Sequence, residues 1–348
     1  MTTVCYTTRE EIKRALNLHE TSISDGQVDR ANASASQDVE GLLNRVFYPV
    51  VQTKYFPWPD REMNYPWRLW LDDDTLIAAT AVACAGTTIP SGNYYLEPVN
   101  SGPPYSRIEI NLGSQSAFGA GTTRQRSIAV TGTWGYTADE TPAGALAAAV
   151  TDTTGTTWTV TDGSLVGVGS LLHVDSERVI VTGRAMTTTA QTLQTDLTAL
   201  ASNVAVAVTT GSAYHPGEVL QLDTERMLID SVTGNTLTVR RGWDGTVLAT
   251  HTGSTIYASR ALTVQRGVLG TTAATHSNAA TVTAALYPGT IRALTVAEAV
   301  NTLLQEQTGY ARTAGSGDAI RQMRLDAILD LRGRAQRDYG RQARTRVV

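Results

Sequence analysis

The sequence predicts an α+β protein in which a discontinuous helical core with a small β-layer is interrupted by an all-β insertion of two related modules. Three observations lead to this prediction. Helix-start patterns occur at both ends of the chain, the middle lacks helical periodicity, and phrases within that middle recur. We expect the core in residues 1–140 and 288–348, and the inserted β-domain in residues 141–287.

The N-terminal part of the core is expected to form two helices. Thr8 to Glu11 and Ser24 to Gln27 have the spacing of a capping box, in which two side chains satisfy free amides at a helix start. The first helix should reach about Leu18. Apolar residues spaced by three and four carry the second to about residue 46, before Pro49.

The β-layer should follow directly. Val51, Thr53 and Tyr55 alternate with polar residues, and further strands are expected at 68–71, 76–84, 94–97, 107–111 and 127–133. The aromatic residues of 55–70 could stack on sugars or bases, but burial in this layer or at a subunit interface is favoured. Asp72, Asp73 and Asp74 lack the further ligands of a cation site and are interpreted as a turn.

The repeats occupy the predicted insertion, after a small-residue linker at 138–157. Asp175-Ser176-Glu177-Arg178 recurs as Asp223-Thr224-Glu225-Arg226, and Leu-Thr-Val-x-Arg-Gly begins at both Leu237 and Leu262. The second copy of the latter phrase comes after the second module is complete. We therefore favour nesting of the second module within the first, which predicts strand pairing between 171–181 and 261–282. The alternative is a tandem arrangement with 192–208 as a diverged half.

The repeated carboxylates are the first candidates for chemistry. Asp175 with Glu177, and Asp223 with Glu225, could act as acid–base pairs. Their duplication and the arginines that follow them, Arg178 and Arg226, favour a structural role as salt-bridged strand edges. His251 and His276 are equivalent repeat positions, which favours a role in the fold over a zinc site. With no nucleotide loop or nucleophile motif, we expect no catalysis, metal or cofactor.

Composition narrows the class of protein further. The net charge is −4 with 17% charged residues, which does not suit a disordered or DNA-coating protein. The two cysteines are far apart, and no apolar run is long enough to span a membrane. The N-terminus lacks a signal-peptide pattern, so synthesis in the cytoplasm without membrane association is expected.

The C-terminal part combines helices with a basic tail. Thr295 to Glu298 forms a third capping box, and a last amphipathic helix is expected from near Asp318. From Arg321 to Val348 there are eight arginines and three aspartates, a local charge of +5. Such a tail could touch DNA phosphates or dock on an acidic protein.

These ends resemble the head–tail adaptors, or head-completion connector proteins, of tailed bacteriophages of the siphophage type. The resemblance rests on the paired helices of 7–46, on Asn93-Tyr94-Tyr95-Leu96-Glu97-Pro98, on 130–136, and on the Ala-rich helix after Pro288. The repeats in turn resemble a small β-module of phage virion proteins. The usual adaptor lacks this module, whereas the present chain carries two copies of it between residues 136 and 288.

The resemblance implies a structural neck protein of the virion. Such adaptors form a ring, usually dodecameric, below the portal protein. The ring continues the channel for genomic DNA without sequence-specific contact and receives a downstream neck, stopper or tail protein. The tail usually engages the portal, which implies contacts by Arg332, Arg334, Arg337, Tyr339, Arg341, Arg344 and Arg346. Deleting residues 332–348 should then abolish portal binding while leaving a folded subunit.

Two rival functions remain at this stage. One is a virion-surface or carbohydrate-binding protein that uses the β-modules, and the other is an enzyme such as a wall hydrolase. The helical ends and basic tail argue against the first, and the missing acid–base or metal constellation argues against the second.

Overall fold

The chain is mostly β-sheet, which corrects the predicted α+β class with its helical core. The computed structural model describes residues 4–18, 22–59, 65–71, 75–119, 121–307, 313–314, 321–322 and 325–341. Strands account for 36% and helices for 21% of it, in four helices and large antiparallel sheets. Helices do form towards both ends of the chain, but the strands between them build apolar cores of their own.

The described residues divide into two compact units. The first comprises those of Met1–Val39, Glu140–Val268 and Thr272–Ala335, and the second those of Glu40–Asp139, Leu269–Thr271 and Gln336–Val348. The domain boundaries near residues 140 and 288 that the sequence suggests remain a prediction. Consistent with the expected proximity of the insertion's two ends, Glu140 lies opposite Ala285 in adjacent strands.

Three helices of the first unit share an apolar core. They are α1 (Arg9–Leu16), α2 (Asp25–Leu43) and α3 (Gly289–Gln307). Ile12, Val28 and Leu303 are among the side chains buried between them. The Thr8 side chain accepts a hydrogen bond from the Glu11 amide at 3.2 Å, as the first capping box predicts. Helix α2 ends a little before the expected residue 46, since Asn44 takes a left-handed conformation with φ of 53°.

Two C-terminal predictions were wrong in position. Helix α3 begins at Gly289, so Thr295 lies in its interior and donates to the Ile291 carbonyl at 2.9 Å instead of capping a helix start. The last helix, α4 (Leu325–Tyr339), begins later than expected. Arg321–Gln322 forms strand β19, which pairs with β18 (Thr313–Ala314), and Asp318 lies outside the described residues.

The second unit contains two antiparallel sheets around one core. The first sheet has the order β1 (Val50–Phe56), β7 (Ile128–Trp134), β3 (Leu76–Cys84), β4 (Thr87–Ile89). The second has the order β2 (Arg68–Trp70), β6 (Arg107–Ile110), β5 (Tyr94–Glu97), and β5 follows a short 3-10 helix, η1 (Ser91–Asn93). The strands predicted in this segment are all present within a residue of the expected bounds. Strand β4 was missed.

The first unit contains one ten-stranded antiparallel sheet. Its order is β12 (Ala205–Ala207), β15 (Thr236–Arg240), β14 (Glu225–Thr233), β13 (Val219–Leu222), β16 (Thr255–Gln265), β11 (Glu177–Thr192), β10 (Leu171–Val174), β17 (Thr281–Ala285), β8 (Glu140–Ala145). Strand β9 (Thr157–Thr159) also pairs with β16. Strand β8 occupies part of the segment expected to be a linker, because the small residues of 140–145 fit a strand whose partner, β17, lies far along the chain.

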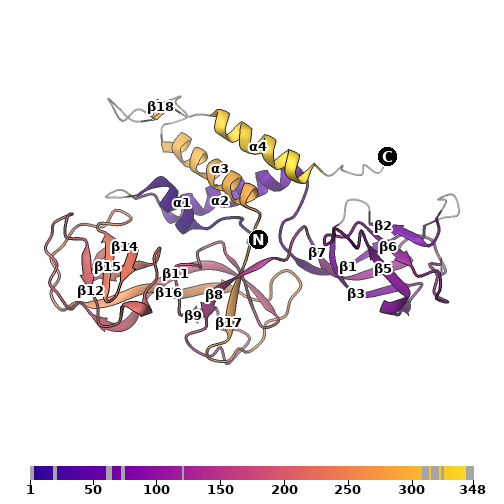
Figure 1. Cartoon of the computed structure of the whole chain (residues 1–348), viewed down its shortest axis with the longest axis horizontal. Helices are drawn as coiled ribbons and strands as arrows, with labels where there is room; N and C mark the ends of the chain where they lie inside the picture. Colours follow the sequence, from indigo (N-terminus) through magenta and orange to yellow (C-terminus); the bar gives the residue numbers. More distant parts are fainter. Residues whose placement is uncertain are drawn as a thin grey trace. The chain divides into compact units, whose positions relative to one another are not determined.

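The second module is nested within the first, as the sequence favoured. Residues 180–185 of β11 pair with 261–265 of β16, and β10 pairs with β17. The remaining halves, 187–192 and 255–258, belong to the second module together with β12 to β15 and the 3-10 helix η2 (Gly211–Ala213). The first module therefore consists of β8, β9, β10, β17 and the other halves of β11 and β16, and these two long strands run from one module into the other (Figure 1).

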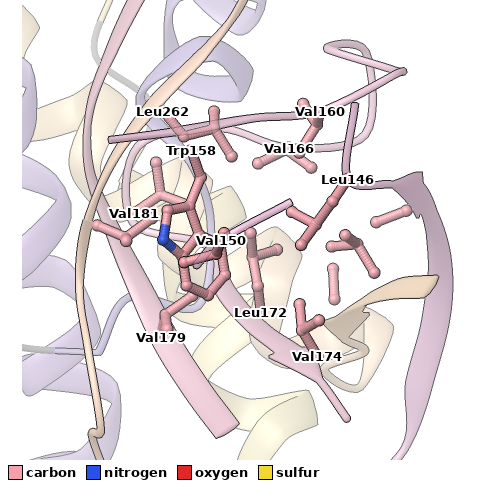
Figure 2. Close-up of a cluster of buried hydrophobic side chains, with 14 of the residues drawn as sticks. Leu146, Val150, Trp158, Val160, Val166, Leu172, Val174, Val179, Val181 and Leu262 are labelled. Atoms are coloured by element: carbon pink, nitrogen blue, oxygen red, sulfur yellow. The ribbon is translucent and has the colours of Figure 1, made fainter. Parts of the chain in front are cut away.

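Each module has its own apolar core. In the first, Trp158 from β9 packs among the valine and leucine side chains of the neighbouring strands (Figure 2). The second core gathers around Leu220, Met227 and Leu237. Each core is therefore complete within its module, and β11 and β16 contribute one half to each module.

Candidate functional site

The second repeat contains a cluster of charged side chains, of which all but Asp223 are buried. We call Asp223, Glu225, Arg241 and His251 the second knot. Glu225 is completely buried, and its carboxylate receives a bidentate pair from Arg241 at 2.6 and 2.7 Å. The amides of Gly242 and Ala249 each donate to it at 3.0 Å. The His251 Nε2 lies 3.0 Å from the same carboxylate.

The first repeat reproduces this cluster with residues that are farther apart in sequence. Asp175, Glu177, Arg266 and His276 form the first knot. Arg266 contacts the buried Glu177 carboxylate at 3.0 and 2.7 Å, and the amides of Gly267 and Ala274 donate at 3.0 and 2.9 Å. The His276 Nε2 lies 2.9 Å from it. The two knots therefore have the same donors around the same acceptor.

Each histidine lies between two carboxylates. The Nδ1 of His251 is 2.7 Å from Asp223, and the Nδ1 of His276 is 2.7 Å from Asp175. A carboxylate oxygen only accepts, so both contacts of a ring are hydrogen bonds when both of its nitrogens carry protons. A knot in that state combines two negative and two positive groups, of which the aspartate is exposed and the other three are buried.

The contacts within the knots lower the pKa of their glutamates. Burial alone would raise the pKa of Glu225, but hydrogen bonds from Arg241, His251 and two amides lower it to about 2. The pKa of Glu177 is likewise lowered to about 2, because Arg266 and three further donors outweigh its burial. Both carboxylates therefore stay charged in the interior, where they hold loops together.

The arginines that directly follow the glutamates have other contacts. Arg226 lies 3.2 Å from Asp244, and burial lowers the pKa of the Arg178 guanidinium, which Glu140 partly offsets. The sequence predicted salt bridges within each Asp-x-Glu-Arg phrase. Instead, each glutamate pairs with the arginine of a Leu-Thr-Val-x-Arg-Gly phrase, Glu225 with Arg241 and Glu177 with Arg266. The recurrence of Arg-Gly at Arg241 and Arg266 was the signal that could have identified these partners.

Helix α1 is held by both modules, one at each end. At its start, the Arg9 amide donates to the Val168 carbonyl at 3.0 Å, and the Val168 amide donates to Glu10 at 2.9 Å. Beyond its end, the Asp244 amide donates to the Leu18 carbonyl at 3.2 Å. The buried Lys13 ammonium also contacts the Asp244 carboxylate at 2.8 Å. The short helix therefore depends on both modules for its position.

A cavity lies between α1 and the second module. Charged residues of α1 and of the second module line it with Arg184 of β11, together with Gly217, Trp243 and Ser259. Sequence reasoning did not identify this site, because its residues come from segments more than two hundred positions apart.

The C-terminal helix α4 has two distinct faces. Ile328 and Ala335 are buried, Arg332 contacts Glu298 of α3 at 2.6 Å, and Tyr339 packs edge-on against Phe47. Tyr339 also packs against Tyr136, at 5.4 Å between ring centroids. The other face is exposed and carries Arg334, which pairs with Asp330, and Arg337, with Arg341 just beyond the helix. Arg344 and Arg346 lie outside the described residues.

The predicted aromatic cluster is partly buried. Phe56 is buried, and Trp58 and Trp67 pack against the same core. Tyr55 and Trp70 remain 60% and 48% exposed. Asp72, Asp73 and Asp74 lie outside the described residues.

The described residues offer neither a metal site nor a membrane-spanning helix. No group of three or more histidine, cysteine or carboxylate side chains there could hold a metal ion. None of the helices in that part of the chain is long and apolar enough to cross a membrane.

Comparison of the chain with protein-family models, with curated proteins and with solved structures gives no match.

Proposed function

We propose that this protein is a structural, non-catalytic neck adaptor of a tailed-phage virion, located at the head–tail interface after synthesis in the host cytoplasm. It assembles into a homo-oligomeric ring below the portal protein, of about twelve copies as the family resemblance implies. The ring continues the channel for genomic DNA and receives the next neck or tail protein.

The observation that carries the proposal is that α4 has one packed face and one exposed, arginine-bearing face. One face of the helix packs inward through Ile328, Arg332, Ala335 and Tyr339, while Arg334, Arg337 and Arg341 are exposed. Arg334 and Arg337 are three positions apart on the helix and so share one side of it, and Arg341 follows just beyond the helix end. A fixed helix with an exposed row of arginines suits bidentate docking on carboxylates of a partner such as the portal.

The inward face changes how the tail should be tested. Deleting residues 332–348 would remove Ala335, which is fully buried, and the Tyr339 ring that packs on Phe47. Loss of portal binding in that truncation would therefore not separate docking from folding. Charge reversal on the exposed face avoids this problem.

We expect the double variant Arg337→Glu/Arg341→Glu to bind the portal protein at least tenfold more weakly than wild type, while its circular dichroism and thermal midpoint stay unchanged. The measurement is cosedimentation of the purified chain with portal rings, alongside native mass spectrometry for the ring itself. The matched control is Arg126→Glu/Arg240→Glu, which reverses two exposed arginines elsewhere.

The outcomes separate the parts of the proposal. Portal binding by Arg337→Glu/Arg341→Glu equal to wild type would overturn the role of α4. Failure of the wild-type chain both to form rings and to bind portal would overturn the adaptor function.

A further inference from the structure

The cavity between α1 and the second module has an excess of positive charge. Its volume is about 120 Å³. It is lined by five basic and three acidic side chains, namely Arg9, Lys13, Arg14, Arg184, Arg226, Glu10, Asp25 and Asp244. Asp29 also contacts Arg9, so the lining with this neighbour has five positive and four negative groups, a formal excess of +1.

Three of the basic groups already have aspartate partners. Arg9 contacts Asp25 at 2.7 Å and Asp29 at 2.5 Å. Lys13 lies between Asp25 and Asp244, at 2.6 and 2.8 Å. Arg226 also contacts Asp244, at 3.2 Å. The excess positive charge therefore lies with Arg14 and Arg184, for which Glu10 is the one remaining carboxylate of the lining.

Arg184 is the buried member of this pair, with a side chain only 8% exposed. Its Nη2 donates to the Gly163 carbonyl at 2.7 Å and to the Ser259 hydroxyl at 2.8 Å. The nearest carboxylate oxygen, on Glu10, is 3.5 Å from Nη1. The buried Nε has no hydrogen-bond partner among the described residues. A buried charged donor without a partner is costly, so the Arg184 guanidinium is only partly compensated within the fold.

Arg14 lines the same cavity from α1. Its residue surface is exposed, but its Nη1 lies 2.9 Å from the position that a Cβ on Gly217 would occupy, so the guanidinium is tucked against the module. It makes no ion pair within the described part of the chain, and its Nε reaches only the Glu10 carbonyl, at 3.3 Å. Burial lowers the pKa of Arg14, and repulsion by Arg184 and Arg292 opposes the attraction of Glu11 and Glu10.

We propose that this cavity is a binding site for a small phosphate-type oxyanion, held by the guanidinium groups of Arg14 and Arg184. Planar guanidinium groups donate parallel hydrogen bonds to such oxyanions, and a bound anion offsets the excess positive charge of the lining. The cavity is several times the roughly 30 Å³ that one water occupies in the liquid, so a five-atom ion fits. Inorganic phosphate and the phosphate group of a mononucleotide share this chemistry.

The test is calorimetric titration of the full chain with inorganic phosphate, and separately with deoxyadenosine monophosphate, at constant ionic strength set with chloride. We expect saturable binding of at least one of them, and at least tenfold weaker binding by Arg14→Gln. Because Arg14 is exposed at its surface, this variant should keep the wild-type circular dichroism. Arg184→Gln is a second variant with the same expected direction.

The matched control is Arg30→Gln, which removes an exposed arginine that pairs with Glu306 away from this cavity. It should bind the anion as wild type does. Competition between the two ligands would assign the site to the phosphate group itself, and binding of the mononucleotide alone would assign it to a larger ligand. No saturable binding of either ligand, or unchanged binding by Arg14→Gln, would overturn the proposal.

Discussion

At the scale of single residues, the buried glutamates Glu177 and Glu225 are the most constrained groups of the repeats. Each is fully buried and accepts from an arginine, two amides and a histidine. A buried ion pair adds little net stability over an apolar substitute, but removing one partner leaves the other charge unpaired in the interior. The knots should therefore be intolerant of single substitutions.

We expect Glu225→Gln to destabilise the protein by about 3 kcal/mol or more, because Arg241 would keep its charge without a counter-ion. Glu177→Gln should behave alike, since Arg266 occupies the equivalent place. The measurement is the urea unfolding midpoint. Arg240→Gln, which removes an exposed neighbour of Arg241, should change stability by only about 0.5 kcal/mol. Equal midpoints for Glu225→Gln and Arg240→Gln would refute this account of the knot.

At the scale of elements, the helices are stabilised both by local sequence signals and by tertiary contacts. Helix α1 has eight residues, which is too short to be stable alone in water. The Thr8 side chain caps its first turn. In addition, the first module hydrogen-bonds to the start of the helix, and the second module hydrogen-bonds to the residues just beyond its end. Helix α2 is longer and depends more on its own sequence.

Gly41 in α2 offers a direct test of that dependence. It lies on the exposed side near the helix end, and an added Cβ would meet no atom within 4 Å. We expect Gly41→Ala to stabilise the protein by about 0.4–1 kcal/mol, because alanine loses less backbone entropy in a helix. Thermal denaturation measures the effect. Gly132→Ala is the contrasting variant, since its Cβ would lie 2.1 Å from the Ala78 carbonyl oxygen in the adjacent strand. A midpoint at or below wild type for Gly41→Ala would contradict the expectation.

At the scale of the molecule, two complete β-modules share one sheet by means of two long strands. Strand β11 has sixteen residues and β16 eleven, and register shifts mark the bulges where they pass between modules. The first knot joins Glu177 to Arg266, so the second module is built between the two halves of the first. Stability of the first unit should thus depend on both knots.

This dependence predicts a specific loss of stability in acid. The pKa of both glutamates is about 2 in the folded chain, against an ordinary value of 4.5. A carboxyl with a depressed pKa stabilises the fold fully above its unfolded pKa, and loses that contribution as pH falls towards the folded one. We expect the urea midpoint to fall from about pH 4.5 towards pH 2, with a contribution on the order of a few kcal/mol from the two glutamates.

The control is the double variant Glu177→Gln/Glu225→Gln, in which neither knot glutamate titrates. Its urea midpoint should be lower at neutral pH and should change less between pH 5 and pH 2.5. If both proteins showed the same acid profile, other carboxylates would be responsible.

The elements were predictable where the signal is local. Alternation of side chains located the strands of the second unit, and the Thr8 pattern located the start of α1. The Thr295 pattern failed because the same residues also suit a helix interior, where packing of Ile291 and Leu294 favours an earlier start at Gly289. The balance between helix and sheet also escaped local patterns, because short strands of small residues, such as β8, become stable only against a distant partner.

The sequence by itself determined the duplication, the strand-and-turn character of the modules and the equivalence of His251 with His276. It also favoured nesting, because the order of repeated phrases along a chain restricts how they can pair. Only the tertiary structure decided that Glu177 pairs with Arg266 instead of Arg178, and that Arg14 and Arg184 face one cavity. Such contacts join residues far apart in sequence, and their energies depend on burial and geometry that exist only once the sheet has formed.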